Sequence, residues 1–317
     1  MAHRLPRGGP AAKLAGMIAH PPFRLFMNPR HGVPGIVVLP ESGFRRASAE
    51  IRSWPDHVPC LPKSLPDVAR EAGIASLHAA RVASPGYAYA ALRLLRAELA
   101  RRGMPEGAAD AVTFACAEGR GDDVAAIASG VLRLGARCAA FVTDEVFLGA
   151  GVHRIHGGYQ DALRAAAEKG WLLVSAMAAP GFTEVPRDIM QGDRLVLEEA
   201  LAALPISPTH VIVPGGRGGL AAAAAVQLRA RGAGVPRLVV TEPMGESPLM
   251  ALAEGRAGFE ASLLAWQELE RSAFAFLEGA NVMTDVVAAA SDPASRAALG
   301  LEPESRLLVL HEMGDTP

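Results

Sequence analysis

From about residue 84 onward, the hydrophobic residues alternate between two spacings. Apolar residues at helical intervals predict amphipathic helices, and short continuous apolar runs predict strands that are buried on both faces. The expected helices cover residues 87–102, 122–134, 159–169, 189–204 and 220–231, and the expected strands cover residues 111–116, 138–143, 151–155, 172–176, 211–213 and 237–241. This alternation is typical of an α/β fold in which parallel sheets are covered by helices.

The two ends of the chain interrupt this rhythm. Residues 1–40 are rich in Pro, Arg and Gly and predict an arm that lies on the body, with an apolar cluster at residues 23–27, before a short helix at 42–54. Near the C-terminus we expect a helix over 263–277 and a last strand over 306–310 that returns to the main sheet. We therefore predict a large α/β domain from residues 1–80 and 170–317, and a smaller one from residues 81–169.

Composition narrows the class of protein further. Half of the 317 residues are hydrophobic but only 5% are aromatic, so the core must consist mainly of Ala, Val and Leu. The net charge of -2 and the lack of a basic stripe argue against a nucleic-acid partner. No apolar run approaches the roughly 20 residues of a membrane span, and the first residues are unlike a signal peptide, so we expect a cytoplasmic protein. The widely spaced Cys60, Cys116 and Cys138 predict free thiols.

The most informative segment joins the expected strand at 211–213 to the alanine-rich helix through five residues: Gly215, Gly216, Arg217, Gly218 and Gly219. Backbone N–H groups of such a turn, with the positive end of the following helix, can hold a phosphate or a carboxylate. Arg217 would then grip the anion or point to solvent. The alternative is a tight strand-to-helix turn without a ligand.

A second group of polar residues follows the expected strand at 111–116. Its members are Glu118, Arg120, Asp122 and Asp123. Parallel α/β sheets bind ligands outside the carboxyl ends of their strands, where these residues would lie. The alternative is that Asp122 caps the next helix while the others form a solvated loop. His153 and His156 fall on opposite faces of a strand, and we expect no metal site there.

Short stretches spread in order along the chain resemble one known family. They are residues 25–29, 43–44, 53–55, 159–162, 170–171, 184–186, 189–192, 208–211, 215–219, 242–243, 299–301, 305–306 and 314–316. Together they resemble the diaminopropionate ammonia-lyases, which belong to the tryptophan synthase β-like enzymes of pyridoxal phosphate (PLP) fold type II. The resemblance implies two α/β domains around a PLP site and a homodimer, in which the apolar cluster at 23–27 would serve the interface.

The sequence departs from this family where the cofactor is attached. Family members are longer and carry the PLP lysine just before the helix that corresponds to residues 87–102. Here residues 76–86 contain no lysine, and the chain has only Lys13, Lys63 and Lys169. Arg81 falls nearest to the lysine position, but a guanidinium cannot form a Schiff base. His78, in the same stretch, is either a general base or an ordinary surface or core histidine.

The loop that contacts the cofactor ring in the family also differs, because residues 117–123 lack its asparagine. We therefore predict a shortened, degenerate homologue that binds a small anionic ligand or a protein partner. The alternative is a PLP-independent lyase, hydratase or isomerase, in which Glu118, Asp122, Asp123 or His78 moves protons. Non-covalent binding of PLP is the third possibility.

Overall fold

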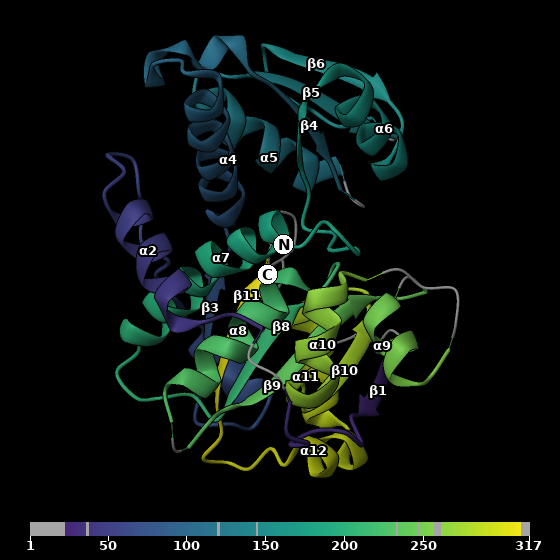
Figure 1. The fold of residues 1–317 in the computed structure, drawn as a ribbon. Coiled ribbons are helices and arrows are strands. Elements are labelled where there is room, and N and C mark those ends of the chain that lie inside the picture. The colour runs from purple at the N-terminus through teal and green to yellow at the C-terminus, as the bar shows by residue number, and fades with distance from the viewer. Residues whose placement is uncertain are drawn as a thin grey trace, which may run out of the picture.

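The computed structural model describes residues 23–35, 38–118, 121–143, 145–232, 234–245, 247–256 and 261–311, without the side chain of Asp122. The described chain forms two α/β units that lie one above the other in Figure 1, each built on its own sheet. The expected α/β class with two parallel-type sheets is confirmed.

The larger sheet has seven strands in the order β1-β10-β9-β8-β11-β3-β2. Its five inner strands run parallel, while the two edge strands are antiparallel to their neighbours. The strands are β1 (Arg24–Met27), β2 (Lys63–Ser64), β3 (Ser76–Arg81), β8 (His210–Pro214), β9 (Arg237–Pro243), β10 (Ala275–Gly279) and β11 (Arg306–His311). As predicted, the last strand returns to the main sheet, where it lies between β8 and β3.

Helices cover both faces of this sheet, as its continuous apolar strands require. One face packs against α7 (Glu184–Ala202), α8 (Gly219–Ala230), α9 (Pro248–Ala253) and α10 (Leu263–Ser272). The other face packs against α3 (Pro66–Glu71), α11 (Val282–Ser291) and α12 (Pro293–Leu299). The helix α2 (Glu41–Arg52) lies on the outer side of α7. The core between these layers is rich in alanine, as the composition indicated.

The smaller sheet has four parallel strands in the order β6-β5-β4-β7. They are β4 (Thr113–Ala117), β5 (Arg137–Val142), β6 (Val152–His156) and β7 (Leu172–Val174). Beside them lie α4 (Gly86–Arg102), the short helix η1 (Glu106–Ala111), α5 (Gly121–Arg133) and α6 (Tyr159–Lys169). The predicted domain boundary after residue 169 thus lies before β7, although β7 pairs with β4 in the smaller sheet.

The two units meet where the first turn of α4 packs against α7. A Cβ on Gly192 would lie 2.6 Å from the Cα of Gly86, so this approach requires glycine at both positions. Asp193 fixes the start of α4, because its Oδ1 accepts hydrogen bonds from the Ser84 hydroxyl at 2.5 Å and from the Gly86 amide at 3.0 Å. Residues 189–192, one of the family-like stretches, therefore form the joint between the two units.

The structure corrects the sequence interpretation at both ends of the chain. The helix expected over 263–277 stops at Ser272, and the apolar run after it forms β10 in the large sheet. Residues 24–27 form the edge strand β1 rather than a loose arm. The apolar side chains of residues 23–27 pack against the core of their own chain and stay partly exposed, and the interface role expected for them stays a prediction.

The described residues also settle two smaller points. Cys116 and Cys138 are buried free thiols with their Sγ atoms 3.4 Å apart, and Cys60 is a half-buried free thiol, as predicted. Within the described ranges, no helix combines the length and the apolar character that crossing a membrane requires.

Candidate functional site

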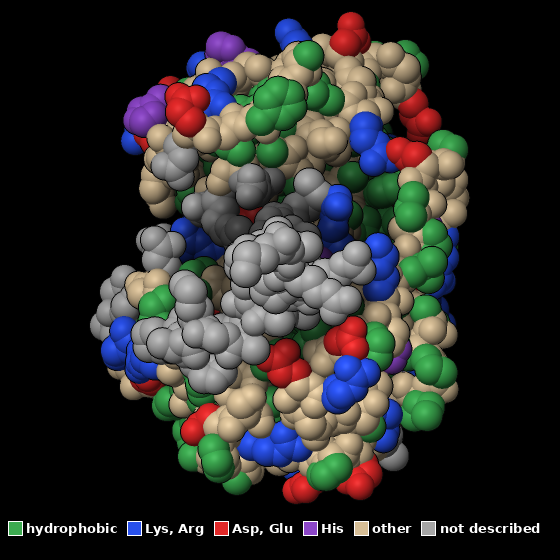
Figure 2. All heavy atoms as spheres, turned by 180° about the vertical axis from the view of Figure 1, so that it is seen from behind, with side chains coloured by type: hydrophobic (Ala, Val, Ile, Leu, Met, Phe, Trp, Pro, Cys, Tyr) green, Lys and Arg blue, Asp and Glu red, His purple; other side chains and the backbone are tan. Residues whose placement is uncertain are grey.

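The carboxyl ends of the two sheets face each other. In the large sheet β8 ends at Pro214 and continues into the glycine turn (residues 215–219), while in the small sheet β4 ends at Ala117, just before Glu118. A Cβ on Gly219 would lie 3.9 Å from the Cβ of Ala176, which follows β7. Figure 2 shows that the surface is hollowed between the two units. We call this region the interdomain crevice.

Two residues of the glycine turn adopt positive φ angles, 50° at Gly216 and 96° at Gly218. The turn is closed by a 2.7 Å hydrogen bond from the Gly218 amide to the Gly215 carbonyl. A Cβ on Gly218 would lie only 2.8 Å from the Cβ of Ala265 on α10. Because α8 begins at Gly219, its first N–H groups have no partner inside the helix. The turn is therefore rigid, and its amides are suited to an anion.

Glu118 lies on the opposite side of the crevice, next to the loop that follows β7. Its side chain is buried, and its Oε1 accepts hydrogen bonds from the Ser175 hydroxyl at 3.1 Å and from the Ala176 amide. The Ser175 hydroxyl oxygen in turn accepts a 3.1 Å hydrogen bond from the Met177 amide. These bonds hold the Glu118 carboxyl in one position.

Burial raises the pKa of Glu118 to about 7. The Asp123 charge raises this pKa further, whereas the bonds from Ala176 and Ser175 and the charge of Arg217 oppose the rise. Burial raises the pKa of Tyr159, and the charge of Glu118 adds to that effect. The structure thus brings Glu118, Asp123 and Arg217 into one electrostatic environment, with Tyr159 beside Glu118.

Two other members of the predicted site are described only in part. Helix α5 begins at Gly121, so Asp122 lies in its first turn rather than at the cap position that the alternative interpretation assigned to it. The Asp122 side chain and the whole of Arg120 lie outside the described residues. His153 and His156 lie on the edge strand β6, and among the described residues no group of His, Cys, Asp and Glu forms a metal site.

The position of His78 favours the ordinary histidine over the general base, the two interpretations that the sequence left open. His78 sits in the middle of β3, where its register partner on β11 is Leu308. With a rise of about 3.3 Å per residue, His78 lies roughly 10 Å before the end of the strand at Arg81. Arg81 is the residue that reaches the carboxyl edge, in register with His311. The sequence interpretation missed that this segment is an inner strand.

The two described lysines lie away from the glycine turn. Lys63 is exposed on the edge strand β2, which β3 and β11 separate from β8. Lys169 ends α6 at the amino end of β7, with its Nζ 4.4 Å from the centre of the Trp171 ring. The connection from β3 to α4, residues 82–85, contains Val, Ala, Ser and Pro. Lys13 lies outside the described residues.

A buried acid under the glycine turn was missed from the sequence. Glu242 ends the apolar run of β9, and a Cβ on Gly215 would lie 2.9 Å from its Cγ. Its two oxygens accept hydrogen bonds from the amides of Leu249 (3.1 Å) and Met250 (2.7 Å) at the start of α9. Burial raises the pKa of Glu242 to about 7. An acid at the end of a buried strand, just before Pro243, was the signal that could have identified it.

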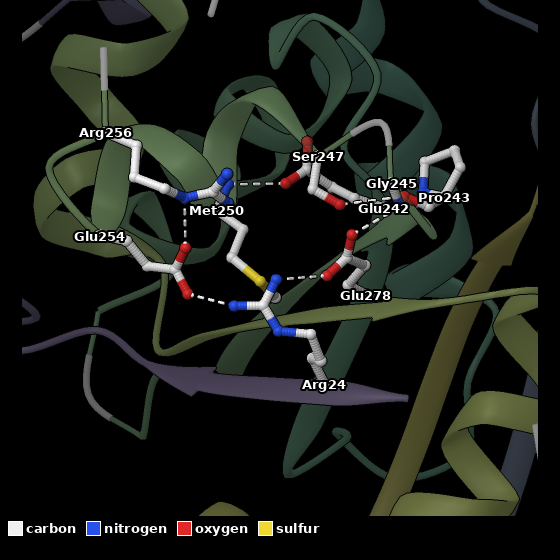
Figure 3. Close-up of polar contacts among 9 residues, drawn as sticks. All are labelled: Arg24, Glu242, Pro243, Gly245, Ser247, Met250, Glu254, Arg256 and Glu278. Atoms are coloured by element: carbon white, nitrogen blue, oxygen red, sulfur yellow. Dashed lines mark hydrogen bonds and ion pairs between the residues drawn. The ribbon is translucent and has the colours of Figure 1, made fainter. Parts of the chain in front are cut away.

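Figure 3 shows how this acid is surrounded. Its register partner Glu278 accepts hydrogen bonds from the Gly245 amide (2.7 Å) and from Arg24 (2.9 Å). Arg24 also pairs with Glu254 at 2.6 Å. Burial raises the pKa of Glu278, but the bonds from Gly245 and Ser247 and the charge of Arg24 outweigh it and lower the pKa overall. These contacts hold the carboxyl ends of β9 and β10 together next to the glycine turn.

The fold and the crevice define the class of protein, a PLP fold type II enzyme scaffold. The profile of the pyridoxal-phosphate-dependent enzymes matches residues 87–309, and the chain belongs to this family. No curated protein matches the sequence significantly. The match covers the crevice-lining elements from α4 to β11, including the glycine turn.

Solved structures show the same fold at low sequence identity. Holo diaminopropionate ammonia lyase from Escherichia coli is 18% identical, with 92% of this chain and 93% of that chain covered and a TM-score of 0.76. Maize serine racemase is 14% identical, with 89% and 95% covered and a TM-score of 0.66. Threonine deaminase isoform 2 from Solanum lycopersicum is 14% identical, with 98% and 94% covered and a TM-score of 0.61.

Proposed function

We propose that this chain is a family member that no longer forms a Schiff base with PLP and that binds a small anionic ligand in the interdomain crevice. One observation carries the proposal. The rigid glycine turn leads into the first amides of α8, which have no partner inside the helix, whereas the connection between β3 and α4 contains no side-chain amine. The anion end of the site is retained, and the residue for covalent attachment is not.

The residues fit PLP only in part. The turn at 215–219, with Arg217, is suited to a phosphate or a carboxylate. Arg81 reaches the carboxyl edge at the end of β3, but its guanidinium stays protonated and cannot attack an aldehyde. Lys63 and Lys169 lie at other edges of the two sheets. The described residues of the crevice do not fit a covalently held cofactor, and we derive no reaction step through one.

The proposal is tested by adding PLP to the purified protein, followed by borohydride reduction and peptide mass spectrometry. We expect no stoichiometric pyridoxyl-lysine and no aldimine absorbance. We also expect inorganic phosphate to bind, and the variant Arg217→Ala to weaken this binding about tenfold, the loss of one charge-assisted contact. Stoichiometric reduction onto Lys13, Lys63 or Lys169 would contradict the proposal, and the three Lys→Ala variants would identify the residue.

A second candidate function is a PLP-independent lyase, hydratase or isomerase acting on an amino acid or a related acid. The observation that favours it is Glu118, a buried carboxyl with a pKa raised to about 7 that lies within the electrostatic influence of Arg217. Such a group can take up and release a proton near neutral pH. Activity on a panel of amino acids and hydroxy acids should then fall at least a hundredfold in Glu118→Gln. The same assay on the variants Asp122→Asn, Asp123→Asn and Arg217→Ala shows how much each neighbouring side chain contributes to the activity.

The partners remain predictions. The homodimer rests on the family resemblance, and the partly exposed apolar residues 23–27 are its proposed contact. A protein partner, the absence of nucleic acid and a cytoplasmic location are proposed on sequence grounds alone. Sedimentation of the purified chain at several concentrations decides between a monomer and a dimer. A single monomeric species at every concentration would contradict the predicted dimer.

A further inference from the structure

A separate cavity lies at the opposite edge of the large sheet from the glycine turn. It is a depression with a volume of about 540 Å³ that is open to solvent. Three loops surround it, each leading into the amino end of an inner strand: β8, β9 or β11. The cavity is therefore distinct from the interdomain crevice, and we call it the amino-edge cavity.

Two guanidinium groups line the amino-edge cavity, and both are held in place from one side. Arg237 donates through Nη1 to the carbonyls of Leu299 (2.6 Å) and Gly300 (3.2 Å). Arg306 donates through Nε to the Ser207 carbonyl (2.8 Å) and through Nη1 to the Glu304 carbonyl (3.2 Å). A guanidinium has five N–H donors, so each group keeps further donors while its orientation is fixed.

Two acids balance these charges. Glu302 and Glu304 line the same cavity from the turn that precedes β11. Hydrogen bonds close this turn, because the Glu302 amide donates to the Ser305 hydroxyl oxygen and the Ser305 amide donates to the Glu302 carbonyl, both at 2.9 Å. The acids therefore project from a fixed backbone, although their side chains are exposed.

The buried His210 in the cavity wall adds no third positive charge near neutral pH. Its Nε2 lies 3.0 Å from the Leu299 carbonyl oxygen, which can only accept, so Nε2 carries the hydrogen. Its Nδ1 lies 2.8 Å from the Thr209 hydroxyl. Burial lowers the pKa of His210, and the charge of Arg237 adds to the effect. The cavity lining thus carries two cations, two acids and no net charge.

From this balance we propose that the amino-edge cavity binds a free amino acid as a zwitterion. Its carboxylate would contact the open donors of Arg237 or Arg306, and its ammonium group would lie toward Glu302 or Glu304. The cavity also borders the start of β8, whose other end carries the glycine turn. A ligand at this edge would contact the strand that also positions the glycine turn. This proposal does not rest on the function proposed for the crevice.

The test is calorimetric titration of the full chain with a panel of free L-amino acids, compared with their N-acetyl and amide derivatives. We expect binding of a free amino acid that weakens at least tenfold when either charge is removed. Arg237→Gln should weaken the binding of the amino acid to a similar extent. The double variant Glu302→Gln/Glu304→Gln should also weaken it, and it changes only side chains in the turn before β11, outside the sheet. Arg217→Ala, in the crevice, is the matched control and should leave this binding unchanged.

Three outcomes would overturn the proposal. One is no binding of any free amino acid, and another is equal binding of the N-acetyl or amide derivatives. The third is binding that is lost in Arg217→Ala but kept in the glutamate double variant, which would place the ligand in the crevice. The phosphate titration described above is independent of all three, so the two proposals can fail separately.

Discussion

Glu118 and Glu242 occupy equivalent places in the two sheets, but their carboxyl groups are bound differently. Each follows or ends a buried parallel strand at its carboxyl edge, and burial raises the pKa of each to about 7. In Glu118 one oxygen accepts both hydrogen bonds, from Ser175 and Ala176. In Glu242 each oxygen accepts one backbone amide at the start of α9.

This difference separates a structural acid from a candidate chemical one. Glu242 uses both oxygens to hold α9 under the glycine turn, so a substitute needs two acceptors. Both hydrogen bonds to Glu118 are accepted by Oε1, and the side chain lies in the field of Arg217 and Asp123, so a proton on Oε2 need not break those bonds. Similar pKa values therefore arise from burial in both places and do not by themselves indicate function.

Both carboxyls make stability depend on pH in the same direction. The folded-state pKa is raised from 4.5 to about 7, so the folded chain binds these protons more tightly than the unfolded chain. The resulting stabilisation is complete below about pH 4.5 and is lost as the pH rises through about 7. For each group the full difference is roughly 3 kcal/mol, from about 1.4 kcal/mol per pKa unit.

The largest expected effect is a loss of stability from a substitution on the Glu242 side, in the glycine turn. In Gly218→Ala, the new Cβ would lie 2.8 Å from Ala265 and 3.3 Å from Leu249, whose amide bonds Glu242, at a φ of 96° that favours glycine. Overpacking and backbone strain together should destabilise the protein by about 4 kcal/mol. Urea unfolding measures the loss. Gly216→Ala, with a φ of 50° and open space around its Cβ, is the control and should lose about 1 kcal/mol.

Next in size is the charge effect at Glu118. In Glu118→Gln the amide oxygen can keep the bonds from Ser175 and Ala176, while the buried charge is gone. We expect the free energy of unfolding to rise by less than about 1 kcal/mol at pH 5 and by roughly 3 kcal/mol at pH 8. Unfolding curves across this pH range measure it. Glu145→Gln, whose side chain is fully exposed, is the control and should show no such gain. An equal loss at both pH values would mean that Gln cannot replace the bonds.

The same substitution at Glu242 should act in the opposite direction at pH 5. At that pH both acids are largely neutral in the folded chain, so the loss of charge adds less than about 1 kcal/mol. Glutamine offers one acceptor oxygen and would turn an NH₂ group toward the amide of Leu249 or Met250. Losing one bond and leaving a buried donor unpaired should cost about 2 kcal/mol. Unfolding at pH 5 measures the loss, and no change in stability would show that α9 does not depend on Glu242.

Much of the fold followed from the spacing of apolar residues. The predicted segments for α4, α5, α6, α8, β5, β6 and β9 agree with the structure to within a few residues, because continuous apolar strands and capping glycines mark their limits. The strand β10 was wrong because its apolar residues directly follow those of α10, and a short apolar run suits a helix or a strand equally well. The edge strand β1 was missed because only pairing with β10 makes it a strand.

The candidate site was predictable where a residue follows a strand in sequence. Glu118 and Asp123 were selected by this rule and Arg217 by the glycine turn, and the structure places the three in one electrostatic environment, while their roles stay predictions. The role of His78 was left open between a general base and an ordinary histidine because the segment 76–81 was not predicted as an inner strand. Ser175 and Glu242 were missed because their importance depends on which strands are neighbours, and strand order is a property of the whole fold.

The smallest expected effect is a shift in the pKa of Glu118 when a neighbouring charge is removed. The Asp123 charge raises the pKa of Glu118, so Asp123→Asn should lower that pKa by less than about one unit. The pH range over which stability falls should shift down by the same amount, because the linkage follows the folded-state pKa. Titration of the ¹³C-labelled Glu118 carboxyl by NMR measures the shift directly. Arg217→Ala is the opposite control, since the loss of its positive charge should raise the pKa. If neither variant moves the titration, the charges on the two sides of the crevice are not coupled, and Glu118 is a structural acid like Glu242.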